Sequence, residues 1–180
     1  MTEKSPVPPL ERIFDLADLS EAGTEIRLAS SESDLEKLAQ WVEVDAIEKF
    51  EAVITLRRSG QARFLYSAHL TAGIVQTCVV TLSPLHNHID SRFERELLLV
   101  RKAHHPEQGG EVVVGATDEE GPEEIESSRF DIAGPVLEEF ILAIDPYPKA
   151  PDAAFAAPQG VEEPRRESPF AVLGKLKGKS

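Results

Sequence analysis

Apolar and polar side chains alternate along most of the stretch between Phe64 and Leu99. Up to Leu82 the even positions carry the apolar set, and after Ser83-Pro84 the odd positions carry it. The two sets are Phe64, Tyr66, Ala68, Leu70, Ala72, Ile74, Cys78, Val80 and Leu82, followed by Ile89, Phe93, Leu97 and Leu99. A period of two is typical of strands that bury one face. The pattern therefore predicts a long antiparallel hairpin with its turn at Ser83-Pro84.

Shorter patterns predict further elements before the hairpin. Alternation from Thr24 to Ala29 and again from Phe50 to Leu56 predicts two more strands. Between them, a polar run precedes a helical stripe, and Ser33 with Glu36 matches a capping box. We expect a helix that ends at about Trp41 and packs against the sheet.

A late helix is predicted around residues 136–144. Its stripe consists of Ile132, Val136, Leu137, Phe140, Ile141 and Ile144, while Glu138 and Glu139 are expected to face outward. Pro135 fits only the first turn, which Asp131 or Gly134 would cap. Asp145-Pro146 then ends the helix.

These elements predict an α+β fold: a curved, mainly antiparallel sheet, either open or barrel-like, with an early helix and a late closing helix. The first hairpin strand is longer than usual, so we expect a bend or bulge at Gly73. The chain of 180 residues divides into a disordered segment at 1–9, a domain at 10–148 with an acidic loop at about 115–128, and a Pro/Ala-rich linker with a basic tail at 149–180.

Composition favours a cytoplasmic protein. There is no apolar run long enough to span a membrane and no export signal at the amino end. Cys78 is the single cysteine, which fits a reducing compartment, and its place in the apolar set predicts a small buried side chain.

No catalytic, cofactor-binding or metal-binding motif is recognisable. The histidine pairs His86/His88 and His104/His105 lack diagnostic spacing, and the acidic cluster after residue 117 is typical of a solvated loop. We therefore expect no enzyme. The alternative, a metal-dependent hydrolase that trims RNA, would use His88, Asp90 and Glu94 on one strand face.

Two polar residues interrupt the apolar faces of the hairpin, Gln76 on its first strand and Arg95 on its second. Such a residue is satisfied inside the structure, protects a strand edge, or marks a groove. We keep both as candidate partner-binding residues.

Three segments carry a family likeness, and they read QTCVVTLSPLHNHIDSRFERELLL, FDIAGPVLEEFILAIDPYPKAP and SPFAVLGKLKG. They resemble the YceD family, the large ribosomal RNA subunit accumulation proteins, in the form found in alphaproteobacteria. The resemblance implies a role in accumulation or processing of large-subunit (23S) ribosomal RNA and no known catalytic chemistry. It also adds Arg92 to the candidate partner-binding residues. The family commonly has a cysteine pair here, but Thr81 occupies the second position, so no cysteine zinc site is expected.

Charge divides the chain into an acidic body and a basic tail. The total is −13, whereas residues 165–180 carry +4, which leaves −17 on the remainder. An acidic body repels RNA and attracts basic proteins. Two partners remain open: a large-subunit ribosomal protein or pre-ribosomal particle bound by the body, or ribosomal RNA contacted by the tail. The tail's candidate residues are Arg165, Arg166, Lys175, Lys177 and Lys179.

Overall fold

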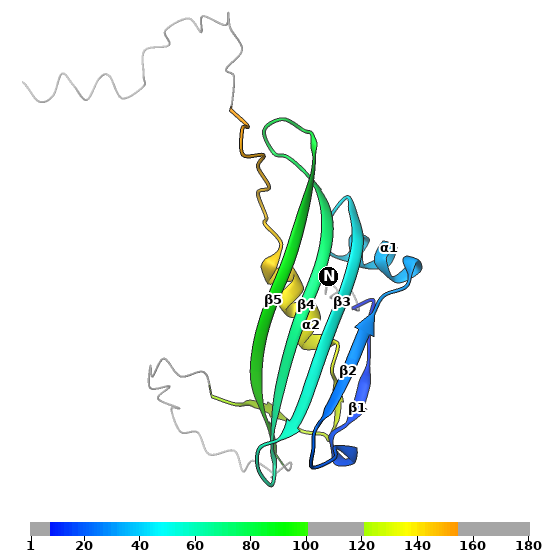
Figure 1. Ribbon diagram of the computed structural model, residues 1–180, viewed down its shortest axis with the longest axis vertical. Coiled ribbons are helices and arrows are strands. Elements are labelled where there is room, and N and C mark those ends of the chain that lie inside the picture. Colours follow the sequence, from blue (N-terminus) through cyan, green and yellow to red (C-terminus); the bar gives the residue numbers. More distant parts are fainter. Residues whose placement is uncertain (1–7, 101–120, 155–180) are drawn as a thin grey trace, which may run out of the picture.

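The computed structural model describes residues 8–100 and 121–154. Within these residues the chain forms a long sheet, a small sheet and two α-helices (Figure 1). The elements are β1 (Ile13–Asp15), the short 3₁₀ helix η1 (Leu16–Asp18), β2 (Thr24–Ala29), α1 (Glu32–Trp41), β3 (Ala46–Arg58), β4 (Arg63–Thr77), β5 (Pro84–Leu99), β6 (Glu123–Ile125), β7 (Arg129–Asp131) and α2 (Gly134–Ala143).

The main sheet has the strand order β2-β3-β4-β5-β6, and β1 pairs with β7 in a separate two-stranded sheet. All neighbours in the main sheet are antiparallel except β5 and β6, which are parallel. The predicted α+β class is confirmed, and the sheet is open rather than closed into a barrel. Glu123–Ile125, which the prediction placed in an acidic loop, forms the strand β6 instead. The free edge of β5 supplies the hydrogen-bonding partner for this short segment.

The hairpin of β4 and β5 follows the predicted alternation, but its turn begins earlier. β4 ends at Thr77, and Cys78–Ser83 forms the turn, with hydrogen bonds from Cys78 N to Ser83 O and from Leu82 N to Cys78 O. Leu82 has a φ of 59° and is 77% exposed. The prediction that the strand reaches Leu82 is therefore wrong, because the apolar alternation continues into a turn.

The irregularity expected at Gly73 lies on the neighbouring strand. Gly73 pairs regularly with β5, whereas the register of β3 against β4 shifts between Ile47 and Lys49. Glu48 is the extra residue, and Lys49 after it is the partner of Gly73. One inserted residue bends the strand that contains it. The sheet is thus curved by a bulge in β3.

Helix α1 begins at a capping box two residues before the predicted pair. Ser31 is the N-cap, its hydroxyl accepts from Asp34 N at 3.3 Å, and the Asp34 carboxylate accepts from Ser31 N at 3.1 Å. The predicted Ser33 and Glu36 pair is therefore wrong, although the predicted end at Trp41 is confirmed. Asp can replace Glu at this position because its carboxylate also reaches the N-cap amide.

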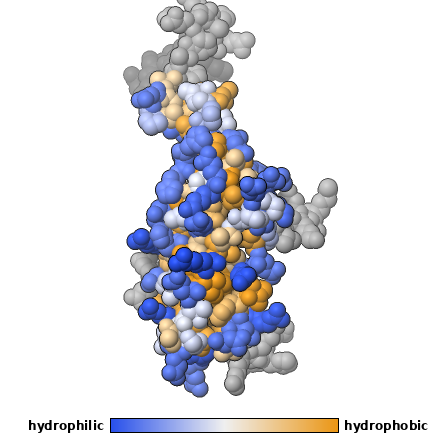
Figure 2. Space-filling model, turned by 45° about the vertical axis from the view of Figure 1, so that its right-hand side comes forward, coloured by the Kyte–Doolittle hydropathy of each residue, from blue (hydrophilic) through white to orange (hydrophobic). Residues whose placement is uncertain are grey.

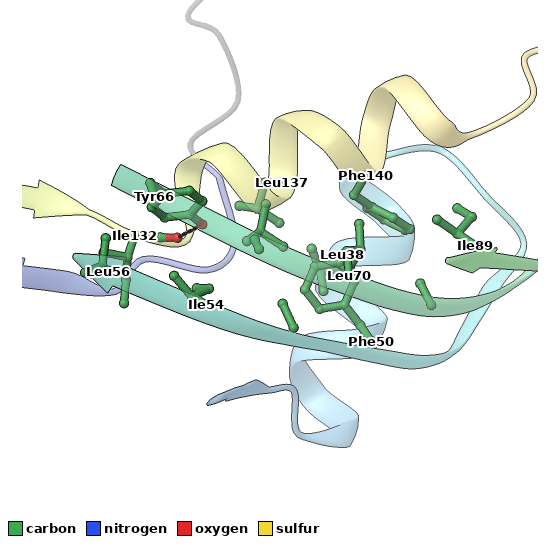
Figure 3. Close-up of a cluster of buried hydrophobic side chains, with 14 of the residues drawn as sticks. Leu38, Phe50, Ile54, Leu56, Tyr66, Leu70, Ile89, Ile132, Leu137 and Phe140 are labelled. Carbon is green, nitrogen blue, oxygen red and sulfur yellow. Dashed lines mark hydrogen bonds between the residues drawn. The ribbon is translucent and has the colours of Figure 1, made fainter. Parts of the chain in front are cut away.

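Helix α2 packs across the inner face of the sheet and completes the core (Figure 3). Phe140 meets Phe50 edge to face with ring centroids 5.0 Å apart, and the Tyr66 hydroxyl donates to Ile132 O at 2.8 Å. Leu38 of α1 joins the same cluster, so both helices cover one face of the sheet. The opposite face remains open to solvent, as is common for antiparallel sheets.

The start of α2 differs in detail from the prediction. Pro135 lies in the first turn as expected, but Ala133 is the N-cap and makes no side-chain cap. The Asp131 carboxylate instead accepts from Ala133 N at 3.1 Å and from Arg12 N at 2.8 Å. Ile141, assigned to the buried stripe, is 45% exposed because the stripe turns away from the sheet near the helix end.

The chain after α2 packs against the β4–β5 turn. Val79 N donates to Pro148 O at 2.9 Å, Ala150 N lies 3.4 Å from Cys78 Sγ, and Ala153 is buried. Turn and tail thus satisfy each other's backbone groups on both sides of the boundary predicted at residue 148. Residues 1–7, 101–120 and 155–180 lie outside the described part, together with His104, His105 and the predicted basic tail.

Candidate interaction surfaces

Arg95 lies under α2 and joins three elements. Its Nη1 lies 2.7 Å from Glu138 Oε2 in α2 and 3.5 Å from Glu123 Oε2 in β6, and its guanidinium lies over the Phe93 ring at 5.6 Å. Partial burial opposes the charged form, but the hydrogen bond and charge of Glu138, followed by Glu123, outweigh it and raise the pKa of Arg95. The charge of this candidate is thus matched internally.

Glu138 is exposed, as predicted, whereas Glu139 is half-buried, and both carboxylates have partners. Glu138 binds Arg95, and Glu139 Oε1 accepts from Ser91 Oγ at 2.6 Å. Both carboxylates face β5, because the two polar residues on the inner face of that strand need partners there.

Gln76 is buried at the end of β4, with 7% of its surface exposed. Its Nε2 donates to Asp145 O at 2.9 Å and its Oε1 accepts from Asn87 Nδ2 at 3.0 Å. The amide therefore joins the residue that follows α2 to the hairpin. Such a group costs stability when buried without partners, so its contacts explain why a polar residue interrupts the apolar face.

Arg92 lies on the open face of the sheet, directly across from His69. It borders a hollow of about 560 Å³ that is also lined by Val53, His69 and Glu94. Within the described residues, no hydrogen bond or ion pair holds Arg92. Of the three described candidates, Arg92 is the one that is accessible to a partner.

Cys78 is buried in the β4–β5 turn, as predicted. The Thr81 hydroxyl, followed by the backbone amides of Ala150 and Thr81, lowers the pKa of the thiol to about 6. These donors come from the turn and from the segment after α2. Cys78 therefore links the turn to that segment by more than apolar contact.

The carboxylates and histidines of the open face form separate pairs. His69 Nε2 lies 3.0 Å from Asp90 Oδ1, His86 Nδ1 lies 3.0 Å from Glu48 Oε1, and Ser67 Oγ donates to Glu94 Oε1 at 3.1 Å. In residues 8–100 and 121–154, no three His, Cys, Asp or Glu side chains are grouped so that they could hold a metal ion. The geometry does not bring His88, Asp90 and Glu94 together as a metal site.

A second hollow lies beside α1, and sequence reasoning missed it. We call it the acidic groove; its volume is about 410 Å³, and it is lined by Glu32, Leu35, Glu36, Ala39, Gln40, Val44, Asp45, Ala46 and Ile47. The signal in the sequence was the pair Glu32 and Glu36, one helical turn apart and beside Leu35. The other wall comes from the chain reversal after α1, which no pattern in the sequence predicted.

The family model described as "Large ribosomal RNA subunit accumulation protein YceD" matches residues 66–177 of this chain. The chain belongs to the YceD family. The match begins within β4 and includes β5, β6, β7 and α2, so it contains Gln76, Arg92 and Arg95. The acidic groove, at residues 32–47, precedes the matched segment. The chain matched no curated protein and no solved structure.

YceD family membership places the protein in ribosome biogenesis, with a role connected to large-subunit ribosomal RNA. The family is not a known enzyme family. In the described part of the chain, neither α1 nor α2 nor any other helix is long and apolar enough to cross a membrane. The basic candidates Arg165, Arg166, Lys175, Lys177 and Lys179 lie outside the described residues.

Proposed function

We propose that this protein is a non-enzymatic, cytoplasmic ribosome biogenesis factor that supports accumulation of large-subunit ribosomal RNA by binding a basic large-subunit ribosomal protein. The observation that carries the proposal is the match to the YceD family model over most of the chain. The conspicuous polar residues of the inner face hold β5, β6 and α2 together, which gives them a structural role rather than a catalytic one.

Charge supports a protein partner in preference to direct RNA binding by the body. The described residues contain 23 Asp and Glu against 11 Lys and Arg. Such a surface repels the phosphate backbone, whose neutralisation by cations dominates nucleic-acid affinity. It attracts proteins that carry the Lys and Arg needed for RNA binding, and it shields them from premature contacts with RNA.

Affinity purification of the tagged protein, with and without ribonuclease, tests this proposal. A basic large-subunit ribosomal protein should remain bound after ribonuclease treatment at moderate salt. An unrelated acidic protein of similar net charge serves as control, because nonspecific attraction would retain the same proteins on both. Loss of every partner with ribonuclease would contradict the proposal.

A second candidate is contact with precursor ribosomal RNA through the basic tail. Residues 165–180 combine five basic residues with Phe170, Leu173 and Leu176 at helical spacing. Deletion of residues 165–180 should then weaken association with pre-ribosomal particles while leaving ribonuclease-resistant protein partners in place. Unchanged association would exclude this role of the tail.

The hydrolase alternative has a direct test as well. Asp90 is paired with His69, so we expect Asp90→Ala to leave ribosomal RNA accumulation unchanged. Metal-dependent RNA cleavage by the pure protein that is abolished by Asp90→Ala would show instead that the protein is an enzyme.

A further inference from the structure

The acidic groove and a neighbouring hollow of about 270 Å³, which shares Val44 and Asp45 with it, both have linings whose charged residues are all acidic. The charged residues of the acidic groove are Glu32, Glu36 and Asp45, with no Lys or Arg in the lining. The hollow beside Arg92 has both signs, and the hollow at the end of β6 contains Arg95, which two carboxylates already neutralise. Charge therefore selects a basic ligand at this part of the surface, where the acidic groove is the larger hollow and has three carboxylates against two.

The groove is built by the end of α1 and the chain reversal that follows it. Val42 N donates to Leu38 O and Val44 N donates to Ala39 O, both at 3.0 Å. Glu43 has a φ of 57°, the left-handed conformation that commonly ends a helix. The reversal brings residues 44–47 alongside α1, and the side chains of Val44 and Ile47 give the groove an apolar floor. In Figure 1, α1 lies beside the first part of β3.

The carboxylates at the rim are available to a ligand. Glu32 and Glu36 are exposed, and no hydrogen bond or ion pair engages either carboxylate within the described residues. Asp45 Oδ2 accepts from Thr77 Oγ1 at 2.8 Å, which fixes the third carboxylate at the other wall. With the α1 side brought forward, Figure 2 shows apolar surface as a band between polar side chains rather than as a wide patch.

From this geometry we infer that the acidic groove binds a basic amphipathic segment of the partner protein. An apolar side chain of that segment occupies the floor at Leu35, Val44 and Ile47, and Lys or Arg residues on both sides pair with Glu32, Glu36 and Asp45. An apolar anchor flanked by complementary charge is a common way of recognising a helix in a groove. The inference rests on the proposed function and names the surface that performs it.

The test compares two variants of the full chain that have equal net charge. Glu32→Gln/Glu36→Gln removes two groove carboxylates, and Glu11→Gln/Glu21→Gln removes two exposed carboxylates away from the groove. The probe is a synthetic peptide with leucines on one helical face and lysines on the other; a second peptide has glutamine in place of leucine. Affinity is measured by titration, and the site is located by amide chemical shifts.

An exposed ion pair changes an equilibrium constant by a factor of about 1.4 to 5, so loss of two should weaken binding roughly 2- to 25-fold. The control variant should bind like the wild type, the leucine-free peptide should bind less well, and the shifted amides should cluster in α1 and residues 44–47. Equal weakening in both variants, or shifts elsewhere, would overturn the groove as the site. If peptide binding requires deletion of residues 165–180, the chain's own tail is the occupant and the assignment to a partner fails.

Purified large-subunit ribosomal proteins free of RNA separate this inference from the proposed function. If the wild type and both variants retain the same basic protein equally, the groove is excluded while the proposed function stands. If the wild type retains none, the proposed function fails. Selective loss from the Glu32→Gln/Glu36→Gln variant supports both.

Discussion

Replacement of Tyr66 by phenylalanine isolates one buried hydrogen bond of the core. The Tyr66 hydroxyl donates to Ile132 O at 2.8 Å, and neither residue has exposed surface. The bond connects the central strand β4 to Ile132, two residues before α2, across 66 positions of sequence. Tyr66→Phe keeps the ring and its contacts but leaves the carbonyl without this donor.

The expected loss is about 1–3 kcal/mol of unfolding free energy, the cost of leaving a buried polar group without its partner. Urea unfolding followed by circular dichroism measures it, and an unchanged m-value indicates that the native surface is preserved. Tyr147→Phe is the matched control, because Tyr147 is 77% exposed. The unfolding free energy of this variant should differ from that of the wild type by less than about 0.5 kcal/mol.

Alkaline pH gives a second and independent readout of the same group. Burial, the largest cause, raises the pKa of Tyr66 above its ordinary value. The unfolded state therefore loses its proton at about pH 10 while the folded state keeps it, so stability falls as pH rises above about 10, by about 1.4 kcal/mol per pH unit. Tyr66→Phe has no hydroxyl to titrate, so its stability does not fall for this reason. The difference in unfolding free energy between the wild type and Tyr66→Phe should therefore shrink above about pH 10. Equal losses in Tyr66→Phe and Tyr147→Phe, or a deficit that does not change with alkaline pH, would refute the reasoning.

Three further predictions concern other parts of the fold. Arg95→Met should lower the unfolding free energy by about 1 kcal/mol, because carboxylates of α2 and β6 lose their cation, and the loss measured by urea unfolding should diminish at high salt. Gly23→Ala should cost about 1–3 kcal/mol in thermal melts, because Gly23 has a φ of 84° and a Cβ would lie 2.8 Å from Leu56 O, whereas Gly121→Ala, with open space around it, should be nearly neutral. The thiolate absorbance of Cys78 should appear with a midpoint near pH 6. Because the lowered pKa stabilises the folded thiolate, the unfolding free energy relative to Cys78→Ala should rise from pH 6 to the thiol's ordinary pKa. An absorbance midpoint near that ordinary value would contradict the prediction.

Hydrophobic alternation predicted the strands of this fold because one face of the sheet is buried along nearly its whole length. The same signal misplaced the end of β4, since Cys78 is buried by the segment around Ala150 and so continues the pattern beyond the last ladder residue. Periodicity reports burial, and burial can come from a turn as well as from a strand.

Elements that depend on a distant partner could not be found in this way. Glu123–Ile125 forms a strand because the edge of β5 is free, and within Glu-Glu-Ile only the isoleucine favours that conformation. The contacts of Gln76 and Arg95 follow from the position of α2 after folding. The acidic groove depends on the left-handed conformation of Glu43, a residue type with no preference for it.

The pairing of β1 with β7 has a consequence for the order of folding. This small sheet joins the first strand of the described residues to the strand that precedes α2, and Arg12 N and Asp131 Oδ1, which meet beside it, are 119 residues apart in sequence. The hairpins β3–β4 and β4–β5 close short loops, whereas the β1–β7 contact must close the longest loop in the domain. We expect the hairpins to form first and the contact between β1 and β7 to close last, so that newly made protein acquires its acidic groove before these two strands are joined.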